Sequence, residues 1–136
     1  MRLKMKSKKS EALKDFLLID GYNVLALLLK KDKRLKKLSF ELQRDELVEK
    51  TYNRFVNTVD EIRIVFDGKS KDEFRAFKEL VVVFHPDADA YIERFCFSNA
   101  QNRIKLVTSD NGIINSVQGK FSSLIRPELF LSMLNK

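Results

Sequence analysis

The stretch Phe16-Leu17-Leu18-Ile19-Asp20-Gly21-Tyr22-Asn23-Val24 decides the fold that we predict for this chain. Its apolar part is short enough for a buried strand, and Gly21 allows a tight turn where the strand passes into a helix. Asp20 would then lie at the carboxyl end of the strand, the edge of an open α/β sheet where ligands bind. Taken alone, Asp20 or Asn23 is better explained as a cap of the next helix. The same pattern recurs along the chain, and the recurrence favours a site.

Strand-like and helix-like segments alternate through the rest of the sequence. Strands are predicted at 16–19, 61–66, 80–84, 103–108 and 121–125. Helices are predicted to start near residues 24, 39, 87, 113 and 127, with a short charged helix over 71–78 and an exposed end or loop over 30–37. Strands this apolar indicate a mostly parallel sheet covered on both faces. We therefore predict a single-domain, three-layer α/β fold, in which right-handed crossovers place all strand carboxyl ends at one edge.

The charge of the chain points to a polyanionic partner. The 136 residues carry a formal net charge of +7, and 44% of them are hydrophobic, which suits one domain with a real core. Residues 1–15 form a basic N-terminal arm, and a second basic cluster follows the first predicted helix. We interpret this second cluster as an RNA-binding surface, made of Lys30, Lys31, Lys33, Arg34, Lys36 and Lys37. An acidic membrane surface or plain solvation would explain the same charges.

Several classes of protein are excluded by what the sequence lacks. Cys96 is the single cysteine and His85 the single histidine, so neither an intrachain disulfide nor a Cys/His zinc site can form. Asp20 and Asn23 interrupt the first apolar stretch and no small-residue cleavage site follows it, so we reject a signal peptide. No apolar run approaches the ~20 residues of a membrane-spanning helix. These features predict a cytoplasmic protein with no membrane partner.

Acidic residues follow four of the predicted strands. They are Asp20, then Asp67, then Asp87 with Asp89 and Glu93, and finally Asp110. Each is explained separately as a cap or turn residue, but together they would converge at one edge. Carboxylates about 5 Å apart repel by roughly 3 kcal/mol per pair at an effective dielectric constant near 20, so protonation or a cation must hold them together. Oxygen ligands alone select Mg²⁺ or Mn²⁺, which activate water for attack on a phosphodiester.

Four fragments, in this order, resemble the signatures of YacP-type NYN domains, which belong to the PIN-like superfamily of metal-dependent ribonucleases. The fragments are Asp20-Gly21-Tyr22-Asn23-Val24, Val65-Phe66-Asp67-Gly68, Ala88-Asp89-Ala90-Tyr91-Ile92-Glu93 and Thr108-Ser109-Asp110. The resemblance covers residues 16–136. It implies a Rossmann-like five-stranded sheet of order 3-2-1-4-5, a Mg²⁺ or Mn²⁺ site, and endonuclease action on RNA. The resemblance further implies that the RNA, in some YacP-type members, is messenger RNA engaged with the ribosome.

The resemblance also implies roles for individual residues. Asp20, Asp89 and Asp110 match the metal-binding acids, and Asp67 matches a fourth acid that holds metal or water. Further positions with implied roles are Glu93 as a supporting or metal-binding acid, Asn23 for positioning Asp20 or a phosphate, and Thr108 and Ser109 for orienting Asp110. We interpret Tyr22 as the one aromatic side chain placed to touch a base. The chain departs from the family pattern in a short connection after Asp67 and in an acid at position 87.

Three functions are compatible with these features. The leading hypothesis is a metal-dependent endoribonuclease that uses Asp20, Asp67, Asp89 and Asp110. The alternative is a catalytically silent RNA- or ribosome-binding module of the same fold, which the retention of all matching acids disfavours. A metal-dependent phosphatase comes last, because enzymes that form an aspartyl-phosphate usually need a second acid two residues after the first, and Tyr22 holds that position.

Overall fold

The computed structural model describes residues 12–135 of the chain. The basic arm predicted for residues 1–15 therefore lies mostly outside the described residues. The elements, in chain order, are β1 (Asp15–Asp20), α2 (Gly21–Lys31), η1 (Lys33–Lys37, a 3₁₀ helix), α3 (Phe40–Phe55), β2 (Glu61–Asp67), β3 (Asp72–Phe77), β4 (Leu80–His85), α4 (Ala88–Ser98), β5 (Arg103–Val107), α5 (Asn111–Ser116), β6 (Ser123–Ile125) and α6 (Pro127–Leu134).

In the described part of the chain, six strands form one sheet with the order β3-β4-β2-β1-β5-β6. All neighbouring strands pair in parallel except β3, which runs antiparallel to β4. The predicted order 3-2-1-4-5 is confirmed, because the five predicted strands correspond to β1, β2, β4, β5 and β6. In the centre of the sheet, β1 lies between β2 and β5, with Asp20 beside Val65 and Ile19 beside Val107.

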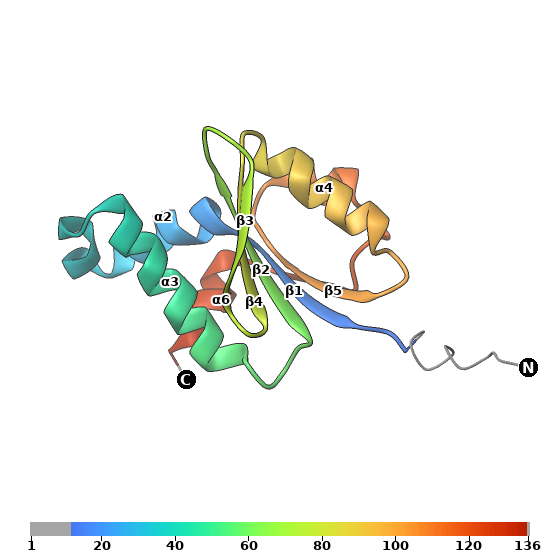
Figure 1. Cartoon of the computed structure of the whole chain (residues 1–136), viewed down its shortest axis with the longest axis horizontal. Helices are drawn as coiled ribbons and strands as arrows, with labels where there is room; N and C mark the ends of the chain where they lie inside the picture. Colours follow the sequence, from blue (N-terminus) through green and yellow to red (C-terminus); the bar gives the residue numbers. More distant parts are fainter. Residues whose placement is uncertain (1–11, 136) are drawn as a thin grey trace, which may run out of the picture.

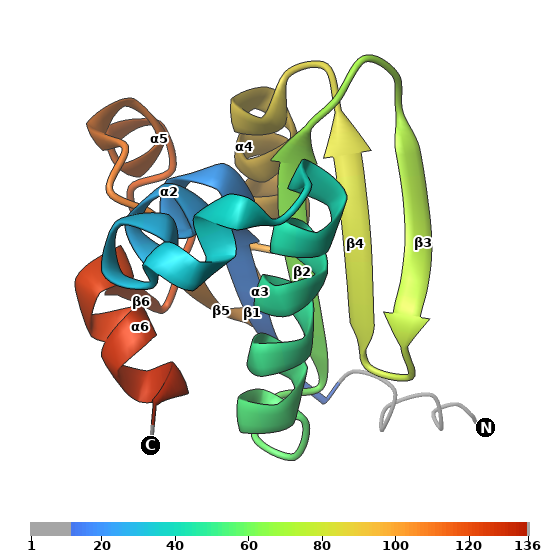
Figure 2. The same cartoon turned by 90° about the vertical axis from the view of Figure 1, so that its left-hand side faces the viewer.

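Helices cover both faces of the sheet, as predicted. Helices α2, α3 and α6 lie on one face, and α4 and α5 lie on the other (Figures 1 and 2). Strand β1 serves both layers, since Leu17 and Ile19 belong to the core under α2 and α3 while Phe16 and Leu18 belong to the core under α4. Cys96 is buried in the second core, where burial raises the pKa of its thiol to about 11. This cysteine is therefore a packing residue.

The helix predicted over residues 71–78 is wrong: the segment forms the edge strand β3, and the sheet has six strands instead of five. The side chains of β3 alternate, with Phe74 packing on Phe84 of β4, and with Glu73 on the other face reaching the hydroxyl group of Tyr91 on α4. Pairing with β3 satisfies the outer backbone groups of β4, which would otherwise form an open edge. Every residue of β3 is exposed and several are charged, so the local sequence does not predict a strand. The strand is stabilised by its pairing with β4.

Among the helices of residues 12–135, not one is both long enough and apolar enough to cross a lipid bilayer.

Candidate functional site

The candidate site begins where β1 passes directly into α2. Asp20 is the last residue of β1 and Gly21 the first of α2. A Cβ atom at Gly21 would lie 2.5 Å from the ring of Phe66 and 2.8 Å from the carbonyl oxygen of Val65. Glycine is thus needed here because β2 approaches the backbone closely. In the described residues only Gly119 has a positive φ. Gly21 therefore has ordinary backbone angles, and glycine is required there because a side chain would collide with β2.

The hydroxyl group of Thr108 connects two of the predicted metal-binding acids. Thr108 is fully buried, and its Oγ1 donates to Oδ2 of Asp20 at 2.9 Å and accepts from the backbone N–H of Asp110 at 3.0 Å. Asp110 caps α5, because its Oδ1 accepts from the N–H groups of Gly112 and Ile113 at 2.8 and 3.2 Å. Among the described residues, the second carboxylate oxygens of Asp20 and Asp110 accept no hydrogen bond and remain available to a ligand.

Asn23 fastens the loop that carries Asp110. Its Oδ1 accepts from the backbone N–H of Ser109 at 2.7 Å and from the Ser109 hydroxyl at 3.0 Å. The contact joins the first turn of α2 to the loop between β5 and α5. The structure therefore places Asn23 and Ser109 beside the acids, with their polar groups engaged with each other.

Two other acids of the predicted set anchor the start of α4. Oδ1 of Asp67, at the end of β2, accepts from the N–H of Ala88 at 3.1 Å, and Oδ1 of Asp87 accepts from the N–H of Ala90 at 3.1 Å. These are capping bonds of the kind that leave a helix N-terminus fixed. They hold the first turn of α4, which carries Asp89, with Glu93 one turn further along on the same flank.

The carboxylates of Asp20, Asp89 and Asp110, which we call the acid group, influence each other electrically. Burial, with a smaller contribution from the charges of Asp89, Asp110 and Asp67, raises the pKa of Asp20 to about 6 against the opposing hydrogen bond from Thr108. Partial burial raises the pKa of Asp89, and the charges of Asp110, Asp87, Asp67 and Glu93 add to the effect. Within residues 12–135, no Lys or Arg forms an ion pair with any member of the acid group.

These donors fit a hard divalent cation. They are carboxylates alone, one oxygen of Asp20 and one of Asp110 accept no hydrogen bond, and within the described residues no lysine or arginine forms an ion pair with them. In the described part of the chain, no three acidic, His or Cys side chains are already arranged as a complete metal-binding group. The acid group therefore has the ligand chemistry that Mg²⁺ or Mn²⁺ prefers, without a preassembled set of three ligands.

Tyr22 and the predicted RNA-binding residues lie elsewhere in the fold. The ring of Tyr22 packs on Phe40 and Phe66, with centroid separations of 5.5 and 5.0 Å, and its hydroxyl accepts from Arg44. Packing accounts for this tyrosine without a base. The basic residues are all exposed, at the end of α2 and on η1, which Figure 2 shows on the α2 and α3 side of the sheet. They and α4 thus lie on opposite faces.

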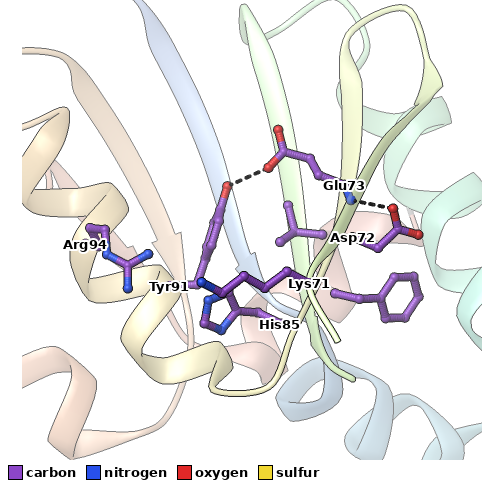
Figure 3. A pocket seen from close by; sticks show the side chains of 8 residues that line it. Lys71, Asp72, Glu73, His85, Tyr91 and Arg94 are labelled. Atoms are coloured by element: carbon purple, nitrogen blue, oxygen red, sulfur yellow. Dashed lines mark hydrogen bonds between the residues drawn. The ribbon is translucent and has the colours of Figure 1, made fainter. Parts of the chain in front are cut away.

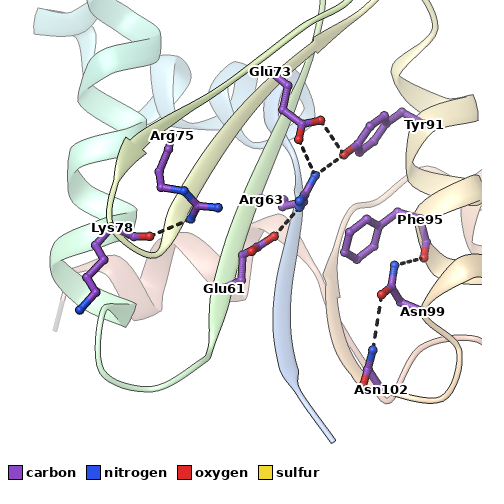
Figure 4. A network of polar contacts seen from close by, with 9 residues as sticks. All are labelled: Glu61, Arg63, Glu73, Arg75, Lys78, Tyr91, Phe95, Asn99 and Asn102. Carbon is purple, nitrogen blue, oxygen red and sulfur yellow. Dashed lines mark hydrogen bonds and ion pairs between the residues drawn. The ribbon is translucent and has the colours of Figure 1, made fainter. Parts of the chain in front are cut away.

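A second cluster of charged residues, which was not predicted from the sequence, surrounds Arg63, and we call it the arginine network (Figure 4). Arg63 of β2 contacts the carboxylates of Glu61 and Glu73, the latter at 3.3 Å, and donates to the hydroxyl of Tyr91 at 2.6 Å. Its guanidinium carbon also lies 5.3 Å from the ring centroid of Phe95. The sequence does hold one sign of this network. A charged residue between Ile62 and Ile64 in a buried strand needs oppositely charged or hydrogen-bonding partners nearby.

Comparisons with known proteins agree with this architecture. The crystal structure of Rae1 (YacP) from Bacillus subtilis matches with a TM-score of 0.70 and 28% sequence identity, covering 89% of this chain and 74% of the Rae1 chain. The structure of a single-residue mutant of Rae1 gives 0.70, 27%, 89% and 75% for the same quantities. A search of curated protein sequences found no match. The family model described as the YacP-like NYN domain matches residues 17–136, and the chain therefore belongs to the YacP-like NYN domain family.

Proposed function

We propose that the protein is a metal-dependent endoribonuclease that hydrolyses RNA phosphodiester bonds, with Asp20, Asp89 and Asp110 as its essential acids. The observation that carries this proposal is a set of carboxylates at the carboxyl edge of the sheet whose charge nothing in the described chain neutralises. Membership of the YacP-like NYN family supports the same activity. A purely structural set of caps would have no reason to leave a buried carboxylate with a pKa of about 6.

The acid group would hold Mg²⁺ or Mn²⁺, with Glu93 as a further acid in reach of the same flank. When bound, the cation orients a water molecule, lowers its pKa and stabilises the leaving oxygen. The chain itself supplies the frame: Thr108 fixes the carboxylate of Asp20, and Asn23 fixes the loop before Asp110. Asp67, matched by resemblance to a metal- or water-holding acid, acts in this frame through α4, whose first N–H it binds.

For the substrate, we propose single-stranded RNA, with messenger RNA engaged with the ribosome as the specific case. The exposed cluster of Lys30, Lys31, Lys33, Arg34, Lys36 and Lys37 would bind RNA phosphates away from the acid group. The ribosome enters through the family resemblance. This assignment predicts that RNA affinity falls steeply with salt, and that charge reversal on η1 reduces the slope by about one for each lost phosphate contact.

The test is RNA cleavage with Mg²⁺ or Mn²⁺, in the presence and absence of ribosomes. Wild-type protein is expected to cleave, whereas Asp20→Asn and Asp110→Asn should abolish cleavage and still bind RNA. Asp45→Asn, which changes an exposed acid on α3, is the matched control and should cleave normally. RNA binding without cleavage in every condition would instead identify a silent RNA- or ribosome-binding module, and equal cleavage by all variants would refute the assignment of the acids.

A further inference from the structure

A polar cavity lies between β3 and α4. It has a volume of about 380 Å³, and the side chains that matter here are Lys71, His85, Tyr91 and Arg94 (Figure 3). Lys71 comes from the loop before β3, His85 ends β4, and Tyr91 and Arg94 belong to α4. None of these residues has a role in the proposed chemistry. The cavity is therefore a feature that the acid group does not explain.

His85 faces this cavity with an unused hydrogen-bond donor. Its side chain is 8% exposed, and its Nδ1 accepts from the backbone N–H of Asp87 at 3.0 Å. Because Nδ1 accepts, the ring hydrogen lies on Nε2. Nε2 is buried and has no hydrogen-bond partner in the described structure. A buried donor without an acceptor is uncommon in folded proteins, and the side chain that carries it lines the cavity.

Two cationic side chains of the same cavity also lack anionic partners. Neither Lys71 nor Arg94 forms an ion pair within the described residues, and Figure 3 shows Lys71 extending past His85 toward Tyr91, with Arg94 beyond Tyr91 on α4. Of the two acids in the wall, Glu73 is already bound by Arg63 and the Tyr91 hydroxyl. Asp72 accepts from the N–H of Glu73 and is the one acid there without a cation. Two cations without anionic partners match the oxygens of a phosphate group.

Helix α4 connects this cavity to the acid group. Asp89 and Glu93 occupy one flank of the helix, and Tyr91 and Arg94 occupy the other, toward β3. His85 stands two residues before Asp87, which caps the same helix. A strand that crosses the N-terminus of α4 would pass from the acid group into the cavity.

We propose that this cavity binds a phosphate group of the RNA strand beside the cleaved bond, with Lys71 and Arg94 as its ligands and the ring of His85 in its wall. This proposal rests on the proposed nuclease function for its substrate, but the anion contact can be measured alone. It gives the nuclease a second contact with the sugar-phosphate backbone, on the α4 side of the sheet and separate from the basic cluster on η1. That contact would fix the direction in which RNA crosses the acid group.

The single histidine makes a direct measurement possible. We would label the untagged protein with ¹⁵N-histidine and follow the Nε2 resonance in the presence of EDTA. Inorganic phosphate and a short oligouridylate would be added in parallel, against sodium chloride at equal ionic strength. We expect a saturable change in the Nε2 resonance with both ligands. The double variant Lys71→Gln/Arg94→Gln should weaken both responses at least tenfold, while Lys69→Gln, an exposed lysine of the same loop outside the cavity, should leave them unchanged.

Each outcome decides one part of the proposal. No saturable change at tens of millimolar phosphate would overturn the anion site, and a change with phosphate but not with RNA would overturn its assignment to an RNA strand. Equal responses of the double variant and wild type would remove Lys71 and Arg94 from the site. The experiment in EDTA does not depend on cleavage. If the Nε2 resonance of His85 shows the expected saturable change but the protein never cleaves RNA, the proposed nuclease activity is refuted and the phosphate site stands.

Discussion

Two clusters of acidic side chains lie along α4, and they differ in how their charge is balanced. In the arginine network, the carboxylates of Glu61 and Glu73 share the guanidinium of Arg63. Burial works against the charge of Arg63, but Glu61 and Tyr91 hold its pKa above the ordinary value. In the acid group, no cation from the described chain faces Asp20, Asp89 or Asp110, and the pKa values of Asp20 and Asp89 are raised.

The difference separates acids that hold the fold together from acids that are kept for a ligand. The arginine network is complete in itself, because each carboxylate has a partner that the sequence supplies. The acid group is incomplete, because repulsion among its carboxylates is balanced only by hydrogen bonds from Thr108 and the start of α5. A cation from outside the chain would stabilise the acid group, and it would not stabilise the arginine network.

The largest expected effect comes from neutralising one acid in each cluster. Asp89→Asn removes a proposed metal ligand, so we expect RNA cleavage to fall by about 100-fold or more. Glu73→Gln keeps the hydrogen bonds to Arg63 and Tyr91 possible and should cleave within about threefold of wild type. Single-turnover cleavage at saturating metal makes the comparison. A loss of the same size in both variants would erase the distinction between the clusters.

The second effect is on the pH dependence of stability without metal. Folded Asp20 binds its proton more tightly than unfolded Asp20, with a pKa of about 6 against 3.8. The folded protein therefore holds more protons in this window, and the free energy of unfolding should fall as pH rises from about 4 to about 6. At about 1.4 kcal/mol per pKa unit, the decrease from this group reaches about 3 kcal/mol.

Urea unfolding in EDTA at a series of pH values measures this effect. Asp20→Asn should remove the decrease, so the difference between variant and wild type isolates Asp20 from every other titrating group. Mg²⁺ should restore stability to the wild type above pH 6 and leave Asp20→Asn unchanged. Curves for the two proteins that run parallel through this window would mean that Asp20 ionises normally.

The third prediction breaks the arginine network. Arg63→Met keeps much of the side-chain volume but leaves Glu61 and Glu73 without their cation, and we expect a loss of about 1–3 kcal/mol in the free energy of unfolding. Arg75→Met is the control, because this exposed arginine contacts only the carbonyl of Lys78, and it should change stability by less than about 0.5 kcal/mol. Unlike the acid group, the network should not regain stability with Mg²⁺. Recovery on adding metal would show that this cluster also binds cations.

The smallest effect is expected at Thr108. Thr108→Val removes the hydroxyl that holds Asp20 and the N–H of Asp110, and cleavage should fall about tenfold. Because this hydrogen bond lowers the pKa of Asp20, the metal-free stability decrease should extend to higher pH in the variant. Thr108→Ser keeps the hydroxyl and should restore both properties. If serine behaves like valine, the methyl group and packing matter more than the hydrogen bond.

Much of the fold followed from local sequence signals. The five parallel strands, the two helical layers and the helix starts near residues 39 and 87 were predictable, because apolar runs and capping residues act over a few positions, whereas the strand order came from the family resemblance. Strand β3 was not predictable in this way. Its residues are exposed and charged, and only pairing with β4 makes them a strand.

The candidate site was predictable in composition but not in its internal contacts. Parallel strands bring the acids to one edge, so Asp20 and Asp110 could be placed near each other from topology alone. That Thr108 bridges them, and that Tyr22 packs on Phe66 instead of facing solvent, depends on rotamers that no spacing rule specifies. The arginine network was not predictable, because it joins β2, β3 and α4 and the local sequence predicts a helix where β3 lies.

The central claim is that the acid group holds a divalent cation, and calorimetric titration of Mn²⁺ and Mg²⁺ into the purified protein tests it without any substrate. Wild-type protein should bind metal, Asp110→Asn should lose that binding, and Glu61→Gln in the arginine network should bind as wild type does. Absence of binding to the wild type at millimolar metal, or equal binding by wild type and Asp110→Asn, would contradict the account.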